Sequence, residues 1–482
     1  MSLLLDAVKN NTPNQVQVLL DKGLDVNEQD EYSNTLLEIA VKNNYVEIAK
    51  LLIEHGADVN VRNHIGETPL FEAAWENLFE IAKLLIEHGA DVNEKIDKKY
   101  TMLSFDEDLS LSVHIKGETP LFNAVPKNSF EVAKLLINNG ADVGAKDDNG
   151  ETPLFAAVSA LVGLLLAKLL IEHGADVNEK NNIGETPLFN AASEDLLALT
   201  KLLIEHGAEV NVKTNNGETP LFAAASALGG SPDVAKLLIE HGADVNEKND
   251  KGETPLFGAA SAYAHTLERS LKVAKLLIEY GANVNEKNDN GETPLFYAAR
   301  KNLREVIGLL IAHGADVNAK DNNGETSLFV ASGEKWDSIA FLLIRYGADV
   351  NAKNNNGETP LLNTVRNNFL EAAMWLIHYG ADVNAIDNEG NTPLFNAISK
   401  DLLEVTDLLI AQGANVNATN KAGETPLFPA VRKNNLEVCK TLINAGADVN
   451  VQNNDGISPL DVALSKNNEE LTEMLREAGA GK

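Results

Sequence analysis

Six histidines of this sequence stand in one recurring context, directly before a Gly-Ala pair: His55, His88, His173, His206, His241 and His313. Imidazole is a common metal ligand, so a shared context raises the question of a metal site. If each histidine ends a separate helix of a stack, successive rings lie about 10 Å apart. Zinc ligands lie about 2 Å from the metal. The spacing therefore predicts that these histidines complement helix dipoles at helix C-termini and bind no metal.

The one cysteine, Cys439, is a second candidate for chemistry, as a thiol nucleophile. It aligns with Ala82 and Ala133 of corresponding segments, which favours a small core residue. A single thiol also excludes a disulfide framework. The HExxH, Walker A and nucleophile-elbow patterns are missing from the sequence. We therefore expect no catalytic residue, no metal site and no cofactor.

A repeated string underlies these recurrences. Gly-Glu-Thr-Pro-Leu-Phe or a variant of it begins at thirteen positions, most of them 33 residues apart. Longer intervals correspond to insertions of 18, 1, 2 and 6 residues, and an incomplete unit precedes the first start. The sequence therefore contains about fourteen units. The starts are Ser33, Gly66, Gly117, Gly150, Gly184, Gly217, Gly252, Gly291, Gly324, Gly357, Gly390, Gly423 and Gly456.

Each unit predicts two short helices. In the unit that begins at Gly66, the glycine suits a turn with positive φ, Thr68 suits an N-cap, and Pro69 suits the first helical position. Apolar residues at helical spacing follow in two segments, and Gly89 suits a helix stop. Helices of about ten residues are marginal alone in water, so each pair must pack on the next pair.

The unit resembles the ankyrin repeat, with its turn glycine, Thr-Pro-Leu-His and Gly-Ala-Asp-Val-Asn. The resemblance implies an all-α fold, an α-solenoid of stacked helix-turn-helix repeats with turn or β-hairpin fingers. Residues 1–482 are expected to form a single array, with a capping unit at 1–30, an inserted finger extension at 97–114 and a second capping unit at 456–482. Phe replaces the family's His in ten units, and we expect this ladder to be core. The substituted positions are Phe71, Phe122, Phe155, Phe189, Phe222, Phe257, Phe296, Phe329, Phe395 and Phe428.

The net charge of −31 argues against nucleic acid or an anionic membrane as a partner, because both need positive charge. No apolar run approaches 20 residues, and the first residues are too short an apolar stretch for a signal peptide, so neither membrane insertion nor secretion is expected. We expect a monomer in the cytoplasm.

The resemblance implies that partner proteins bind a concave groove built from the turn tips and the first helices. Glu follows the turn glycine in ten units, from Glu67 to Glu424, which predicts an acidic ridge along the tips. The exposed positions late in the first helices include Trp75 near the amino end and a run of basic residues near the carboxyl end. This basic line predicts binding of an acidic or phosphorylated protein segment, and the alternative is ordinary surface charge. Its residues are Arg300, Lys301, Arg366, Lys400, Arg432 and Lys433.

Two further features carry binding hypotheses. In the insertion, Leu109, Leu111 and Val113 alternate with polar residues after an acidic turn, which predicts a β-hairpin that contacts a partner; the alternative is a tolerated loop. The asparagine of Ala-Asp-Val-Asn recurs through the units, and loop hydrogen bonding accounts for it. In the ankyrin family, such asparagines can be hydroxylated, and the resemblance permits this here.

The expected function is a non-enzymatic scaffold or adaptor that binds partner proteins on its groove. The alternative is an effector that an intracellular microbe or virus delivers into the host cytosol, because Lys, Asn and Ile are abundant and Arg is scarce, as in AT-rich genomes. An enzyme would need a converging set of groups that the sequence does not suggest.

Overall fold

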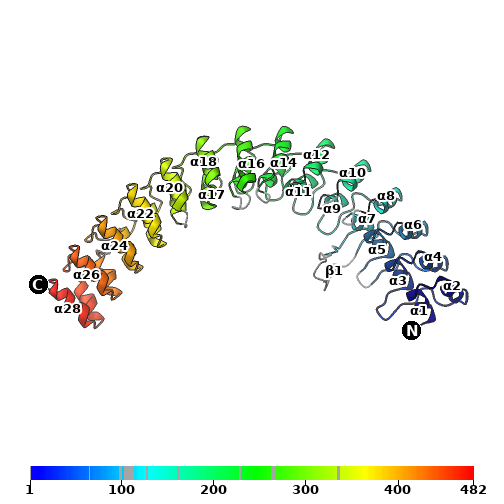
Figure 1. Ribbon diagram of the computed structural model, residues 1–482, viewed down its shortest axis with the longest axis horizontal. Coiled ribbons are helices and arrows are strands. Elements are labelled where there is room, and N and C mark those ends of the chain that lie inside the picture. The colour runs from blue at the N-terminus through cyan, green and yellow to red at the C-terminus, as the bar shows by residue number, and fades with distance from the viewer. Residues whose placement is uncertain are drawn as a thin grey trace. The chain divides into compact units, whose positions relative to one another are not determined.

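The computed structural model describes residues 2–63, 66–96, 100–101, 113–114, 116–125, 129–159, 163–226, 230–261, 267–333 and 337–481. These residues form two compact units: Met1–Ala227 with Ser231–Asn249, and Leu228–Gly230 with Asp250–Lys482. We call them the amino-terminal unit and the carboxyl-terminal unit. In each unit the helices form consecutive antiparallel pairs, as predicted, with first helices packed on first helices and second helices on second helices (Figure 1).

The amino-terminal unit contains seven helix pairs among its described residues. They are α1 (Leu3–Lys9) and α2 (Pro13–Asp21), α3 (Leu36–Lys42) and α4 (Val46–Glu54), α5 (Pro69–Trp75) and α6 (Phe79–Glu87), α7 (Pro120–Ala124) and α8 (Phe130–Asn138), α9 (Pro153–Ser159) and α10 (Leu164–Glu172), α11 (Pro187–Ser193) and α12 (Leu197–Glu205), and α13 (Pro220–Ser226) and α14 (Pro232–Glu240).

The described part of the carboxyl-terminal unit also contains seven pairs. They are α15 (Pro255–Ala259) and α16 (Leu267–Glu279), α17 (Pro294–Arg300) and α18 (Arg304–Ala312), α19 (Ser327–Ser332) and α20 (Asp337–Arg345), α21 (Pro360–Arg366) and α22 (Leu370–His378), α23 (Pro393–Ser399) and α24 (Leu403–Ala411), α25 (Leu427–Arg432) and α26 (Leu436–Asn444), and α27 (Pro459–Ser465) and α28 (Glu469–Glu477). The fourteen pairs agree with the repeat count.

The pair α5 and α6 shows how one repeat folds. Leu70 and Phe71 on α5 and Ile81 on α6 have no solvent exposure, so the predicted apolar faces meet between the helices and the neighbouring pairs. The two helices are joined through Asn77, which has φ 56°, a left-handed conformation that asparagine tolerates better than most residues. Gly89 ends α6 with φ 89°, as predicted for a helix stop. Local backbone conformation sets the ends of the two helices, and burial against the neighbouring pairs stabilises them, because one repeat cannot fold alone.

The backbone conformation at the start of the first helices is the one predicted. Pro69 and its counterparts occupy the first helical positions, and Thr68 has the extended backbone of an N-cap. The capping hydrogen bond varies between repeats: the Thr186 hydroxyl accepts from the Phe189 amide at 3.3 Å, whereas Thr68 makes no such bond.

The phenylalanine ladder is core at nine of its ten positions. Phe71, Phe155 and Phe296 are fully buried, and Phe395 alone of the ten is half-buried. Cys439 is fully buried on α26, as its alignment with alanine predicts.

Successive turns stack through backbone contacts that require glycine. Gly150 has φ 77°, and a Cβ atom there would lie 2.6 Å from Asn182 Oδ1 of the next turn. The Asn182 amide donates to the Asn149 carbonyl at 2.9 Å, and its side-chain Nδ2 donates to the Asp148 carbonyl at 2.8 Å. The turn glycine therefore satisfies a dihedral requirement and a close approach together.

The predicted hairpin begins as an antiparallel pair of two-residue strands, β1 (Tyr100–Thr101) and β2 (Val113–His114). Tyr100 lies opposite His114 in this register. Leu109 and Leu111 lie outside the described residues, so the arrangement beyond the paired ends stays a prediction.

The six-residue insertion lies between the first helix α15 and the second helix α16. Its last part joins α16, which has 13 residues where the other second helices have nine. Ser270 in this added turn is fully buried, and its hydroxyl donates to the Ala259 carbonyl.

At the carboxyl end, Ser458 and Asp461 form a capping box at the start of α27. Leu471 and Leu475 of α28 are buried, and the rest of this helix is mostly exposed and charged, as expected for a cap. The expectation of one continuous array over 1–482 stays a prediction, as do the capping roles of 1–30 and 456–482.

Candidate binding surface

The first helices of the carboxyl-terminal unit carry three ion pairs that join residues at the same two positions of their repeats. In each, the Glu that follows the turn glycine pairs with the Arg that ends the first helix, eight residues later. The carboxylate side chains are 8–11% exposed, whereas the guanidinium side chains are 41–43% exposed. The pairs are Glu292–Arg300, Glu358–Arg366 and Glu424–Arg432, so they occur in every second repeat.

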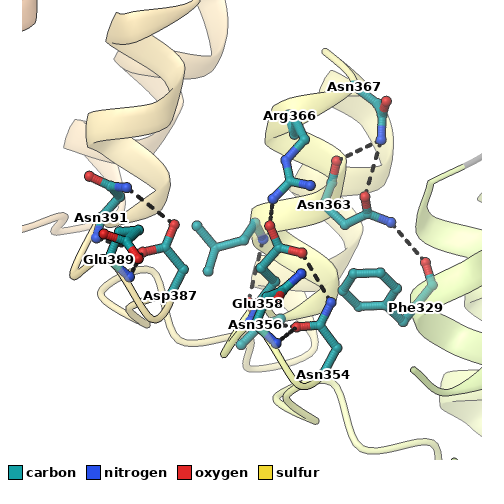
Figure 2. Close-up of polar contacts among 12 residues, drawn as sticks. Phe329, Asn354, Asn356, Glu358, Asn363, Arg366, Asn367, Asp387, Glu389 and Asn391 are labelled. Atoms are coloured by element: carbon teal, nitrogen blue, oxygen red, sulfur yellow. Dashed lines mark hydrogen bonds and ion pairs between the residues drawn. The ribbon is translucent and has the colours of Figure 1, made fainter. Parts of the chain in front are cut away.

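Figure 2 shows how the turn holds one of these carboxylates. Asn354 Oδ1 accepts hydrogen bonds from the amides of Asn356 and Glu358, both at 2.9 Å, and this closes the turn. Asn354 Nδ2 donates to Glu358 Oε2 at 3.0 Å, while Arg366 pairs with Oε1. Both carboxylate oxygens of the buried glutamate therefore have donors, as burial of a charge requires.

The residue types at these two turn positions decide whether the turn itself supplies a side-chain donor to its carboxylate. In another repeat the types are exchanged, and Asn391 Nδ2 donates to Asp387 Oδ2 at 3.3 Å (Figure 2). The repeat with Asp147 and Glu151 has acids at both positions, and Glu151 takes its side-chain hydrogen bond from Asn181 of the next repeat. Burial raises the pKa of Glu151, and the nearby charge of Asp147 raises it further. Burial and the charge of Asp321 raise the pKa of Glu325 in the same way.

The prediction of an acidic ridge along the tips is wrong, because the glutamate side chains that were to form it are not exposed. All ten glutamates that follow a turn glycine are buried or half-buried, and Glu67 is 8% exposed. Three of them pair with the arginine that ends their own first helix, and Glu253 accepts a hydrogen bond from Tyr297 of the next repeat. Sequence reasoning placed these residues at the tips because it did not fix the direction of their side chains.

Tyr297 on α17 is a residue that sequence reasoning missed. Its hydroxyl donates to Glu253 Oε1 at 2.5 Å, and its ring packs edge to face on Phe257 at 5.3 Å between centroids. The Arg300 guanidinium lies 5.7 Å from the Tyr297 ring centroid. Burial, with the hydrogen bond to Glu253, raises the pKa of Tyr297. The available signal was an aromatic residue at a position where no other repeat has one.

The remaining predicted partner-binding residues lie in both units. Trp75 is half-buried in the amino-terminal unit, whereas the basic line lies in the carboxyl-terminal unit. Lys301, Lys400 and Lys433 are exposed directly after the first helices α17, α23 and α25. Val113 lies in β2.

The asparagine ladder connects one repeat to the next. Asn351 Nδ2 donates to the Gly380 carbonyl at 3.1 Å, and its Oδ1 accepts from the Asp382 amide at 2.8 Å. Asn60 and Asn318 make the same two contacts with their next repeats. Hydrogen bonding therefore accounts for the ladder, as predicted, and it does so between repeats.

The six histidines act at helix ends. His88 Nδ1 lies 2.9 Å from the Leu84 carbonyl oxygen, and the other five make the equivalent contact. Burial raises the pKa of Cys439 to about 12, so its thiolate is not formed at neutral pH. Within the described ranges, no three His, Cys, Asp or Glu residues are grouped to hold a metal ion. In the same part of the chain, no helix has the length and apolarity to cross a bilayer.

Comparison with known families gives the class of protein. The family model described as "Ankyrin repeats (3 copies)" matches residues 4–96, 100–181, 159–249, 230–321, 263–354, 328–420 and 402–482. The chain belongs to the ankyrin-repeat family, as its repeat pattern indicates. Ankyrin repeats are protein-interaction modules, so the chain is a scaffold for protein–protein interaction.

Individual relatives cover less of the chain. An ankyrin repeat protein of Rickettsia bellii is 55% identical over 38 residues, which are 8% of this chain and 23% of that protein. The ankyrin repeat domain of Bcl-3, a member of the IkappaB family, is 30% identical with a TM-score of 0.43 and covers 47% of this chain and 99% of the solved chain. Delivery into a host cell, the cytoplasmic location and the monomeric state stay predictions.

Proposed function

We propose that the chain binds a partner protein along the first-helix face of its carboxyl-terminal unit, and that the bound segment is acidic or phosphorylated. The observation that carries the proposal is the repeated Glu–Arg pair, which holds a half-exposed guanidinium in a fixed direction at Arg300, Arg366 and Arg432.

The buried glutamate changes how such an arginine attracts an anion. The pair is neutral in sum, so bulk charge contributes little. A guanidinium has five N–H donors, however, and one carboxylate leaves part of this set directed to solvent. An arginine already held in place also loses less side-chain entropy when it binds. Lys400 and Lys433, the exposed lysines of the same basic line, supply the net positive charge.

The spacing of the pairs suggests the form of the ligand. The three arginines are two repeats apart, which corresponds to about 20 Å at the usual distance between packed helices. An extended peptide rises about 3.3 Å per residue, so it covers this distance in about six residues. A segment with Glu or phosphoserine at every sixth position therefore fits the line.

The test uses a fluorescein-labelled 15-residue peptide with phosphoserine at positions 2, 8 and 14, and its binding to the full chain is measured by anisotropy. Charge reversal of the arginines would place a second carboxylate beside each buried glutamate and destabilise the fold. Replacing both members of each pair by glutamine avoids this, because no buried charge is left alone. We expect this six-fold variant to lose at least tenfold in affinity.

The control replaces only Glu292, Glu358 and Glu424 by Gln. This variant keeps the arginines and removes their neutralising partners, so it should bind the phosphopeptide more tightly than the native chain. Equal affinity of the native chain and the six-fold variant, both with native helix content, would refute the assignment of the site.

A further inference from the structure

A cluster of aromatic side chains lies on the second helices of two neighbouring repeats in the carboxyl-terminal unit. Phe341 on α20 packs edge to face on Trp375 of α22 and on Tyr379 after it, with centroid distances of 5.7 and 6.0 Å. Trp375 and Tyr379 stack at 6.3 Å with an interplanar angle of 21°. These rings hold one another in a single arrangement. We call Phe341, Met374, Trp375 and Tyr379 the second-helix aromatic cluster.

This cluster is exposed although it is apolar. Met374 is 52% exposed, Trp375 44% and Tyr379 36%. Large aromatic residues and methionine are enriched at protein interfaces, and Trp and Tyr dominate binding energy there. A group of such residues on one surface marks an interaction site more strongly than scattered exposed leucines do.

Two of the four cluster positions, those of Phe341 and Met374, are charged in other repeats. Six second helices carry a Lys–Glu ion pair four residues apart, with N–O distances of 3.8–4.0 Å. The corresponding residues are Phe341 and Arg345 on α20, and Met374 and His378 on α22. The fold therefore accepts a charged residue at the Phe341 and Met374 positions, and packing of the stack does not require apolar side chains there. The Trp375 position is leucine on these six helices, so an exposed tryptophan is an enlargement that the repeat does not need. The six pairs are Lys50–Glu54, Lys83–Glu87, Lys168–Glu172, Lys201–Glu205, Lys236–Glu240 and Lys275–Glu279.

The border of the cluster is acidic on one side. Glu371 on α22 and Glu404 and Asp407 on the neighbouring α24 are exposed, and neither helix contains Lys or Arg. On the other side, the Arg345 guanidinium lies over the Phe341 ring, 5.8 Å from its centroid. The surface thus combines apolar rings with negative charge on α22 and α24.

We propose that the second-helix aromatic cluster and its acidic border bind a basic amphipathic helix of a partner protein. Second helices of neighbouring repeats pack about 10 Å apart. A helix that presents apolar residues at i, i+4 and i+7 extends them over about 10 Å, because it rises 1.5 Å per residue. Lysines beside this stripe meet Glu371, Glu404 and Asp407. A second copy of the chain or an anionic membrane would bring negative charge to the same border.

The test uses the full chain and a fluorescein-labelled 18-residue helical peptide with a leucine stripe flanked by lysines, followed by anisotropy. The variant replaces Met374, Trp375, His378 and Tyr379 by Lys, Leu, Glu and His, so that residues 374–379 become identical to residues 83–88. Because that segment already forms a second helix in this chain, the variant should fold. We expect at least a tenfold loss of affinity.

A second variant, Glu371→Gln with Glu404→Gln and Asp407→Asn, keeps the rings and removes the acidic border. It should bind the basic peptide several-fold more weakly, with a smaller dependence on salt. The matched control, Lys201→Met on α12, removes a lysine from an ordinary second helix and should bind like the native chain.

Three results would overturn the proposal. One is an unchanged affinity in the folded 374–379 variant, and another is equal affinity for a peptide with every lysine replaced by glutamate. The third is evidence that the cluster has a different occupant. In that case the basic peptide does not bind, and the native chain either self-associates in sedimentation velocity or binds phosphatidylcholine vesicles. The 374–379 substitutions would abolish that self-association or vesicle binding. This surface is separate from the arginine line, so a negative phosphopeptide result leaves it untouched.

Discussion

Removing Arg366 tests how the carboxyl-terminal unit tolerates its buried carboxylates. The substitution Arg366→Ala takes the guanidinium away from Glu358, whose side chain is 9% exposed, and leaves the Asn354 amide as a donor. The repeat would then resemble the one at Glu325, where Gly333 stands at the arginine position and the carboxyl pKa is raised by burial.

The magnitude follows from the exposure of the two partners. Breaking a fully buried ion pair destabilises a protein by about 3–5 kcal/mol, whereas a surface pair contributes about 0–1 kcal/mol. Here one partner is buried and the other is 43% exposed, so the expected loss is about 1–2 kcal/mol. A loss of this size increases local opening by a factor of about 5–30.

Hydrogen exchange is the suitable assay, because contacts in a repeat stack are local and unfolding need not be two-state. Amide protection in α21 and α22 should fall by this factor at pH 7. The loss should shrink as the pH falls, because protonation removes the buried charge. The double variant Glu358→Gln with Arg366→Ala should recover most of the protection, and Lys400→Ala, an exposed cation after α23, should change nothing.

Unchanged protection in Arg366→Ala, or an equal loss in the double variant, would refute this reasoning. The first result would mean that solvent already screens Glu358. The second would mean that the arginine stem contributes by packing and that its charge is incidental.

Two other perturbations test neighbouring features. Asp147→Asn should raise the thermal midpoint at pH 7. The raised pKa values of Asp147 and Glu151 make native stability fall as the pH rises above the ordinary carboxyl range, and the variant should flatten this dependence in scans from pH 4 to 8. A midpoint below the native value would contradict it. Asn351→Ala removes both contacts to Gly380 and Asp382 and should cost about 1–2 kcal/mol of local stability, measured by hydrogen exchange of α22. If amide protection of α22 in the variant equals that of the native chain, water replaces both hydrogen bonds.

The repeat pattern alone predicted the helix pairs, their number and the buried ladder. Each helix pair is specified by nearby residues, such as Pro69 at the start of the first helix and Gly89 after the second, and by apolar stripes of helical period. The structure agrees at these positions because neighbouring repeats present the same surfaces, so one local solution serves throughout the stack. The burial of Cys439 followed from the same alignment.

Only the tertiary structure decided what the exposed side chains do. Arg366 is eight residues from Glu358, and a closed turn must bring them together before the arginine ceases to be a free charge. Phe341 and Trp375 are 34 residues apart and meet only because two second helices stack in register. Sequence periodicity indicates which face of a helix is apolar. The direction of an exposed side chain depends on how the turns close, and its partner in another repeat depends on how the repeats pack.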